Sequence, residues 1–286
     1  MGAHVGRMFA KALSSLACVA LAALVGCGAS DDATDDAQAG SESAIVGGSR
    51  DLRWAASGYL LAGPSMDRLD ASKPACGATL IAPNVVVTAA HCALREGATE
   101  LAFGTGDVSK ANVVRVVERH AHPEFHARPQ GMIDIPYVLR KNDVAYLVLE
   151  HAITSVTPAE LPSARPAVGC NVQAIGYHVP APGKPSARMS TPACVEFNVN
   201  LGDDPIFEVH PANASGLCNT DGDEGSPVVL RSEQREVLVG FYVGSVTQFL
   251  TDCHTSVQFL DGYESAYGYR SFFAEGIARG KLARGS

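Results

Sequence analysis

The side chains that could perform chemistry gather in three short blocks of the sequence. The blocks are Thr88-Ala-Ala-His91-Cys92, Asn142-Asp143-Val-Ala-Tyr-Leu and Gly222-Asp223-Glu224-Gly225-Ser226-Pro227. Histidine and the carboxylates are residue types of general acid–base catalysis, and serine is a residue type of nucleophilic catalysis. These blocks hold the candidate functional residues, and the rest of the chain must supply the elements that position them.

The surrounding sequence predicts mainly β-strands. Short apolar runs rich in β-branched residues recur between Gly, Pro and Asn, for example at 78–82, 84–88, 144–149 and 237–243. The content of 28 Gly and 16 Pro favours a turn-rich all-β protein over a helical bundle. Only about residues 271–282 are predicted to be helical. The stretch Pro158–Val168, rich in Pro and Ala, is predicted to connect two lobes of similar length.

Length and charge exclude several classes of protein. A chain of 286 residues with 47% apolar residues can form one large domain or two small lobes with real cores. Because only 18% of residues are charged, disorder of the whole chain is excluded. The net charge of −8 argues against non-specific nucleic-acid binding, which requires clustered Lys and Arg.

Residues 1–44 are predicted to lie outside the folded domain. Basic residues precede an apolar run from Ala12 to Val25 that is too short to be a membrane-spanning segment, so 1–26 is predicted to be a signal peptide. The run ends in Leu24-Val-Gly-Cys27, which resembles the bacterial lipoprotein box and implies lipidation at Cys27. The alternative is ordinary cleavage with Cys27 incidental. Residues 27–44, acidic and without bulky apolar side chains after Cys27, are predicted to be a flexible tether.

From Ile45 to about residue 280 the chain resembles the trypsin/chymotrypsin-like serine proteases. The resemblance is carried by Ile45-Val-Gly-Gly, Cys76 to Cys92, Asn142 to Leu149, and Cys218 to Pro227. It implies a protease domain at 45–286, with six-stranded antiparallel β-barrels at about 45–160 and 165–270 and a C-terminal helix at about 271–282. It also implies that His91 is the general base and that Asp143 orients its imidazole.

The chain departs from this family at the nucleophile. Glu224 occupies the place of the attacking serine, although the oxyanion-hole positions, Gly222 and Glu224, are present. A hydroxyl attacks a carbonyl after giving its proton to the base, whereas Glu is ionised at neutral pH and has no proton to give. Ser226 lies two residues further on, roughly 6–7 Å in an extended chain, which is too far to replace the nucleophile.

Other family positions are retained only in part. Ile45 and Asp223 preserve both halves of a zymogen-type ion pair, but Ala44 precedes the cleavage point instead of Lys or Arg. Val243-Gly-Ser aligns with a Ser-Trp-Gly segment, so the serine that supports the buried acid is missing, and the specificity-pocket base is ambiguous, with Gly216 as one candidate. The disulfides implied by the resemblance are Cys76–Cys92 and Cys218–Cys253, with Cys170–Cys194 as the remaining pair.

The predicted function is that of a catalytically inactive protease homologue that binds a protein or peptide in the inter-barrel cleft. The alternative is an active serine endopeptidase with an apolar or small-residue preference. No cofactor and no metal are predicted, because the cluster His120, His122 and His126 is interpreted as a loop, with a metal site as the alternative. The expected state is a monomer in the bacterial envelope, attached to the membrane only through Cys27, with release to the extracellular space as an alternative.

Overall fold

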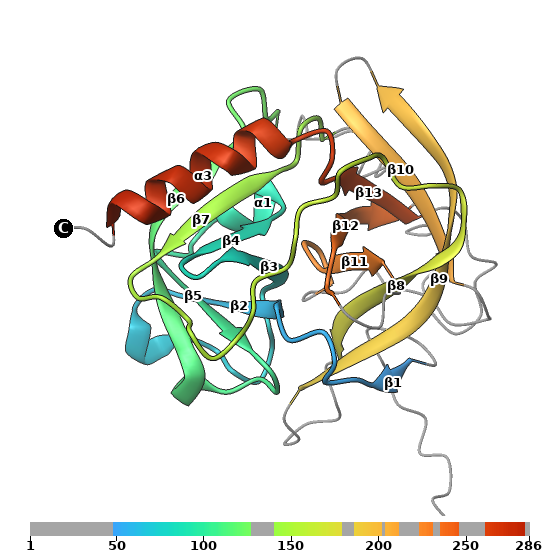
Figure 1. Cartoon of the computed structure of the whole chain (residues 1–286). Coiled ribbons are helices and arrows are strands. Elements are labelled where there is room, and N and C mark those ends of the chain that lie inside the picture. Colours follow the sequence, from blue (N-terminus) through green and yellow to red (C-terminus); the bar gives the residue numbers. More distant parts are fainter. Residues whose placement is uncertain are drawn as a thin grey trace, which may run out of the picture. The chain divides into compact units, whose positions relative to one another are not determined.

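The computed structural model describes residues 48–126, 140–178, 186–201, 204–211, 223–230, 235–245 and 261–283. Within these residues the chain forms two closed antiparallel β-barrels, as the sequence resemblance implied (Figure 1). The fold prediction of two six-stranded barrels with a C-terminal helix is therefore confirmed. The connecting stretch 158–168 contains one isolated bridge, between Glu160 and Val237.

The first barrel closes in the order β2-β3-β4-β7-β6-β5. Its strands are β2 (Ser57–Gly63), β3 (Cys76–Ala82), β4 (Val85–Thr88), β5 (Glu100–Thr105), β6 (Val113–Ala121) and β7 (Ala145–Leu149). Strands β3, β4 and β7 are buried along their whole length, which explains their continuous apolar runs. Strand β4 leads to the block that contains His91, and β7 follows the residue pair that contains Asp143.

The second barrel is a sheet in the order β9-β10-β13-β12-β11-β8 that closes through pairing of β8 with β9. Its strands are β8 (Gly169–His178), β9 (Ala187–Leu201), β10 (Asp204–Pro211), β11 (Pro227–Leu230), β12 (Leu238–Ser245) and β13 (Asp261–Ser265). A short strand, β1 (Ser49–Arg50), pairs with β9. The turn that carries Glu224 immediately precedes β11.

The sequence prediction of helix only near the C-terminus was wrong for one functional segment. Besides α3 (Arg270–Ala283), a single turn of helix, α1 (Ala90–Ala93), carries His91. The 3-10 turns η1 (Met66–Arg68) and η2 (Lys110–Asn112) complete the described helices. Because α1 has four residues and continues the apolar run of β4, periodicity could not separate it from a strand.

Helix α3 packs on the first barrel, and polar contacts join the two barrels. Figure 1 shows α3 beside β7, and the Asn84 amide donates to Gly280 O at 2.9 Å. Between the barrels, Glu236 accepts hydrogen bonds from Ala56 N at 2.9 Å and from Ser57 Oγ at 2.6 Å. Glu236 therefore links the second barrel to the first.

Candidate active site

His91 and Asp143 form a closely hydrogen-bonded pair at the edge of the first barrel. His91 N donates to Asp143 Oδ1 at 2.9 Å, and Nδ1 of the imidazole lies 2.6 Å from Oδ2. Both carboxylate oxygens are thus used by one histidine. Asp143 is fully buried, whereas the His91 side chain is 21% exposed. The pair has the geometry in which a carboxylate fixes the tautomer and orientation of a general base.

The electrostatics of the pair keep Asp143 ionised. Burial raises the pKa of the Asp143 carboxyl, but the charge of His91, the hydrogen bonds from His91 and the charge of Arg140 together lower it below its usual value. With Nδ1 committed to Asp143, the second ring nitrogen, Nε2, is the atom available for proton transfer.

The chain is held firmly where it reaches Asp143. Asn142 adopts a left-handed backbone conformation with φ of 52°, which is uncommon for a residue other than glycine. Its side chain donates to Glu124 O at 3.1 Å and accepts from the Tyr269 hydroxyl at 3.0 Å. Asp143 N then donates to Glu264 Oε1 at 2.9 Å. These contacts fix the direction in which the Asp143 side chain leaves the backbone.

Glu224 lies in a turn whose main chain is fixed against both barrels. Glu224 O accepts a hydrogen bond from Gly77 N of the first barrel at 2.8 Å, and Gly225 N donates to Tyr242 O of the second at 2.7 Å. Gly225 has φ of 78°, and a Cβ there would lie 2.4 Å from Gly77 O. Only glycine fits at position 225, so the main chain of the turn is constrained at this point by its neighbours.

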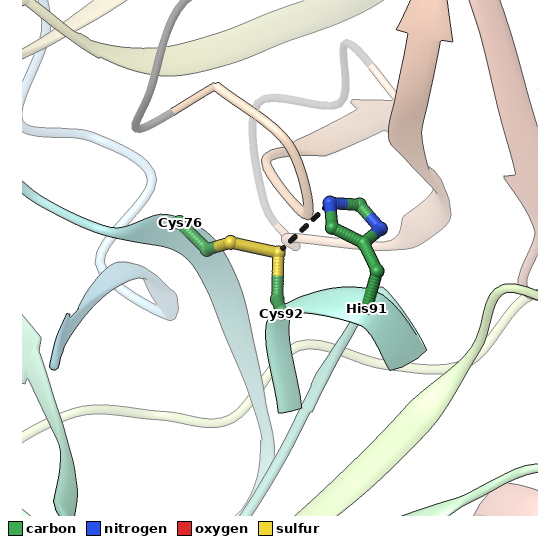
Figure 2. A group of neighbouring side chains, drawn as sticks. All are labelled: Cys76, His91 and Cys92. Atoms are coloured by element: carbon green, nitrogen blue, oxygen red, sulfur yellow. Dashed lines mark hydrogen bonds between the residues drawn. A yellow bond between two sulfur atoms is a disulfide. The ribbon is translucent and has the colours of Figure 1, made fainter. Parts of the chain in front are cut away.

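Figure 2 shows how the imidazole lies above the Cys76–Cys92 disulfide, with the turn before β11 reaching down to it. His91 Nε2 is 3.5 Å from Cys92 Sγ, and the same sulfur is 3.6 Å from Glu224 O. The sulfur of Cys92 thus contacts both the imidazole of His91 and the main-chain oxygen of residue 224. The two sulfurs and the imidazole also form a group of possible metal ligands, but a disulfide offers no thiolate for such a site.

Two polar residues of the site were missed from the sequence. Arg140 Nη1 lies 3.3 Å from His91 Nδ1 and 3.9 Å from Asp143 Oδ2, with a side chain that is 24% exposed. Glu264 reaches Asp143 from β13. The only sequence signal for Arg140 is its place three residues before Asp143, and Glu264 has none, because it lies 121 residues away from its partner.

The remaining predicted residues take varied positions. Asp223 is fully buried, and Ser226 is 1% exposed with its hydroxyl packed against Gly77. The disulfides Cys76–Cys92 and Cys170–Cys194 are confirmed. Val243 is buried on β12. The following predicted residues lie outside the described ranges: Cys27, Ile45, Gly216, Cys218, Gly222 and Cys253.

The three histidines near residue 120 take separate partners. His120 Nε2 contacts Glu118 at 2.7 Å, and its ring stacks on Tyr146. His122 packs edge-on against Tyr269, while His126 is part of an isolated bridge with Lys141. The prediction that all three lie in a loop was wrong for His120, which belongs to β6, whereas His122 follows the end of that strand.

Comparison with known proteins identifies the family. The family model described as Trypsin matches residues 58–257, and the chain belongs to the trypsin family. Human kallikrein-14 is 27% identical over 262 residues, covering 82% of this chain and 84% of the relative. A trypsin of Saccharopolyspora erythraea is 29% identical over 180 residues, covering 55% of this chain and 71% of the relative.

A solved structure shares the fold of this chain. Neuropsin, a serine protease of mouse brain, has a TM-score of 0.61 at 16% identity, and the match covers 82% of this chain and all of the other. At this level of identity the likeness concerns the fold.

Within the described residues, no helix has both the length and the apolar character needed to cross a membrane.

Proposed function

We propose that this trypsin-family protein is catalytically inactive and acts as a binding protein. The observation that carries the proposal is glutamate at position 224, in the turn whose main chain contacts the sulfur of Cys92, the residue after His91. A carboxylate has no proton to transfer to the base, and its attack on a peptide would lead to an anhydride. In an unrelated serine protease, subtilisin, loss of the nucleophile lowers turnover by roughly a millionfold, as measured there.

The packing around the turn supports this proposal. The contacts of Gly77 and Gly225 involve only main-chain atoms of the turn, so they do not depend on which side chain residue 224 carries. A glutamate side chain is longer than that of serine, and we propose that it extends toward His91. Its carboxylate can pair with the imidazole instead of presenting a hydroxyl to a substrate.

The proposed ligand is a protein or peptide bound between the barrels, near the partly exposed His91 and Arg140. Their side chains are polar and partly accessible, while the Asp143 carboxylate that both contact is buried. Accessible polar groups on a rigid support suit recognition of a polypeptide. We propose that the protein acts as a monomer without a cofactor.

The second candidate is an active serine-type endopeptidase. It is favoured by the His91–Asp143 pair, in which both carboxylate oxygens bond to the histidine at 2.9 and 2.6 Å. A protein that had lost all use for proton transfer need not keep this geometry. Catalysis would then require a nucleophile other than Glu224, with a preference for apolar or small residues.

Labelling with a fluorophosphonate probe separates the two candidates. The probe reacts with an activated serine, so we expect no label on the wild-type protein and label on the Glu224→Ser variant. Glu224→Ala is the matched control and should remain unlabelled. A wild-type chain that is labelled, and that cleaves peptides at a comparable level, would exclude the inactive protein that we propose.

We further propose that the protein is lipid-anchored through Cys27 in a bacterial envelope. Metabolic labelling with a palmitate analogue in a bacterial host should mark the wild-type chain and fail for Cys27→Ala. Cys18→Ala is the matched control, since Cys18 lies inside the predicted signal peptide and is removed with it. Equal labelling of wild type and Cys27→Ala would contradict the anchor.

N-terminal sequencing of released material would show Ile45 if cleavage after Ala44 frees the domain.

A further inference from the structure

The second barrel contacts the His91–Asp143 pair through one buried acid. Asp143 belongs to the first barrel, just before β7, and Glu264 lies on β13 of the second barrel. Asp143 N donates to Glu264 Oε1 at 2.9 Å, and both residues have no exposed surface. A hydrogen bond that crosses between barrels in a buried place fixes their relative position at the site itself.

The side chain of Glu264 faces the first barrel and not the interior of the second. Side chains alternate along a strand, and Tyr263 points into the core cluster of the second barrel. Glu264 is paired in register with Phe241, which belongs to the core cluster of the first barrel. The glutamate therefore leaves the sheet on the side where Asp143 lies.

A fully buried glutamate calls for an explanation, because charged residues are almost never fully buried without partners and polar groups lose free energy when they leave water. The hydrogen bond from Asp143 N supplies one reason for its presence. On the neighbouring strand, Val243 is buried but offers no polar side-chain atom. Glu264 thus provides a polar contact to the acid from this barrel.

We propose that Glu264 is a positioning residue that holds the main chain of Asp143 so that its carboxylate aligns with His91. Asn142, in its left-handed conformation, fixes the chain before Asp143, and Glu264 fixes the amide of Asp143 itself. With the backbone set on both sides, the two carboxylate oxygens reach His91 N and Nδ1. This role concerns the alignment of the pair and applies whether or not the protein is a protease.

The test uses NMR to observe the proton between His91 Nδ1 and Asp143. Every protein in the test keeps glutamate at position 224. A short imidazole–carboxylate bond gives a strongly downfield proton signal. We expect the signal in the wild type, its retention in Glu264→Gln, which keeps an oxygen acceptor, and its loss or large upfield shift in Glu264→Leu. Glu236→Leu is the matched control, because Glu236 also joins the barrels but bonds to Ala56 and Ser57.

Each outcome of this test decides the proposal. A folded Glu264→Leu protein with an unchanged signal would overturn it, as would loss of the signal to the same extent in Glu264→Gln or in Glu236→Leu. If Glu264→Leu does not fold, hydrogen exchange of the wild-type protein decides. The Asp143 amide must then exchange as slowly as the amides of buried strands, and exchange at the rate of exposed amides would refute the contact.

Discussion

Asp51 is the residue that fastens the segment before the first barrel. Its carboxylate accepts hydrogen bonds from Arg53 Nη2 at 2.7 Å, Trp54 Nε1 at 3.1 Å and Ser190 Oγ at 2.8 Å. Burial raises the pKa of Asp51, but the hydrogen bonds from Arg53 and Ser190 outweigh this effect and hold the pKa well below 3.8. Ser190 lies on β9, so the carboxylate ties this segment to the second barrel.

A lowered pKa in the folded state makes the contribution of Asp51 depend on pH. The contribution is complete above the unfolded pKa of 3.8 and is lost as the pH falls toward the lower folded value. We expect Asp51→Asn to lower the free energy of unfolding by roughly 1–3 kcal/mol at neutral pH. Urea unfolding of the wild type and of Asp51→Asn should show that the difference between their free energies of unfolding shrinks below pH 3.8.

The control for this measurement is the exposed Asp67, whose change to Asn should alter the free energy of unfolding by less than about 0.5 kcal/mol. A difference between Asp51→Asn and wild type that stays constant down to the most acidic conditions would contradict the assignment of the lowered pKa to Asp51.

At the scale of elements, helix α3 depends on glycine for its close approach to the first barrel. A Cβ added at Gly276 would lie 2.7 Å from Cγ of the Tyr146 ring, inside contact distance. Tyr146 is buried on β7, and β7 directly follows the segment with Asp143. The glycine therefore allows the helix to cover the strand that supports the site.

Replacing this glycine should reverse the usual trend for helices. Alanine normally stabilises a helix interior by about 1 kcal/mol relative to glycine. Overpacking costs about 1–3 kcal/mol, so we expect Gly276→Ala to lower stability by about 1 kcal/mol in thermal or urea unfolding. The exposed Ser271→Ala in the same helix is the control and should be neutral or stabilising. An increase in stability for Gly276→Ala would show that α3 can shift away from β7.

The elements differ in how far their sequence predicts them. Strands such as 144–149 could be predicted because their full burial requires an unbroken run of apolar, often β-branched residues. The helix α1 could not, since one turn contributes too few residues for a helical period. Glu264 could not be predicted for another reason. Its role depends on a partner 121 residues away, and only the packing of the two barrels against each other brings Asp143 N to 2.9 Å from Glu264 Oε1. His91 and Asp143 could be predicted from the sequence because their flanking residues form recognisable blocks.

At the scale of the whole molecule, each barrel contains one of the two disulfides found in the described part of the chain, and these two differ in their exposure to solvent. Cys76 on β3 and Cys92 on α1 are each 1% exposed. Cys170 is exposed and is linked to Cys194 between the neighbouring strands β8 and β9. Reduction requires a thiolate to reach a sulfur atom, so access decides which bond is broken first.

We therefore expect stepwise reduction under native conditions. With increasing dithiothreitol, alkylation and peptide mass spectrometry should find Cys170 and Cys194 modified before Cys76 and Cys92. The first step should leave His91 in place, because β8 and β9 remain paired through their backbones. The second step frees α1 from β3 and removes a cross-link worth about 3 kcal/mol for a separation of 16 residues.

The two steps should also differ in their effect on the site. The downfield proton of the His91–Asp143 pair should survive the loss of Cys170–Cys194 and weaken or vanish with the loss of Cys76–Cys92, since that disulfide directly supports the turn that carries the imidazole. A Cys170→Ser/Cys194→Ser variant isolates the second step, because it retains the buried disulfide. If Cys76 and Cys92 were alkylated first, their disulfide would have to be more accessible than its burial indicates, and the close packing of the turn at residue 224 against Gly77 would be wrong.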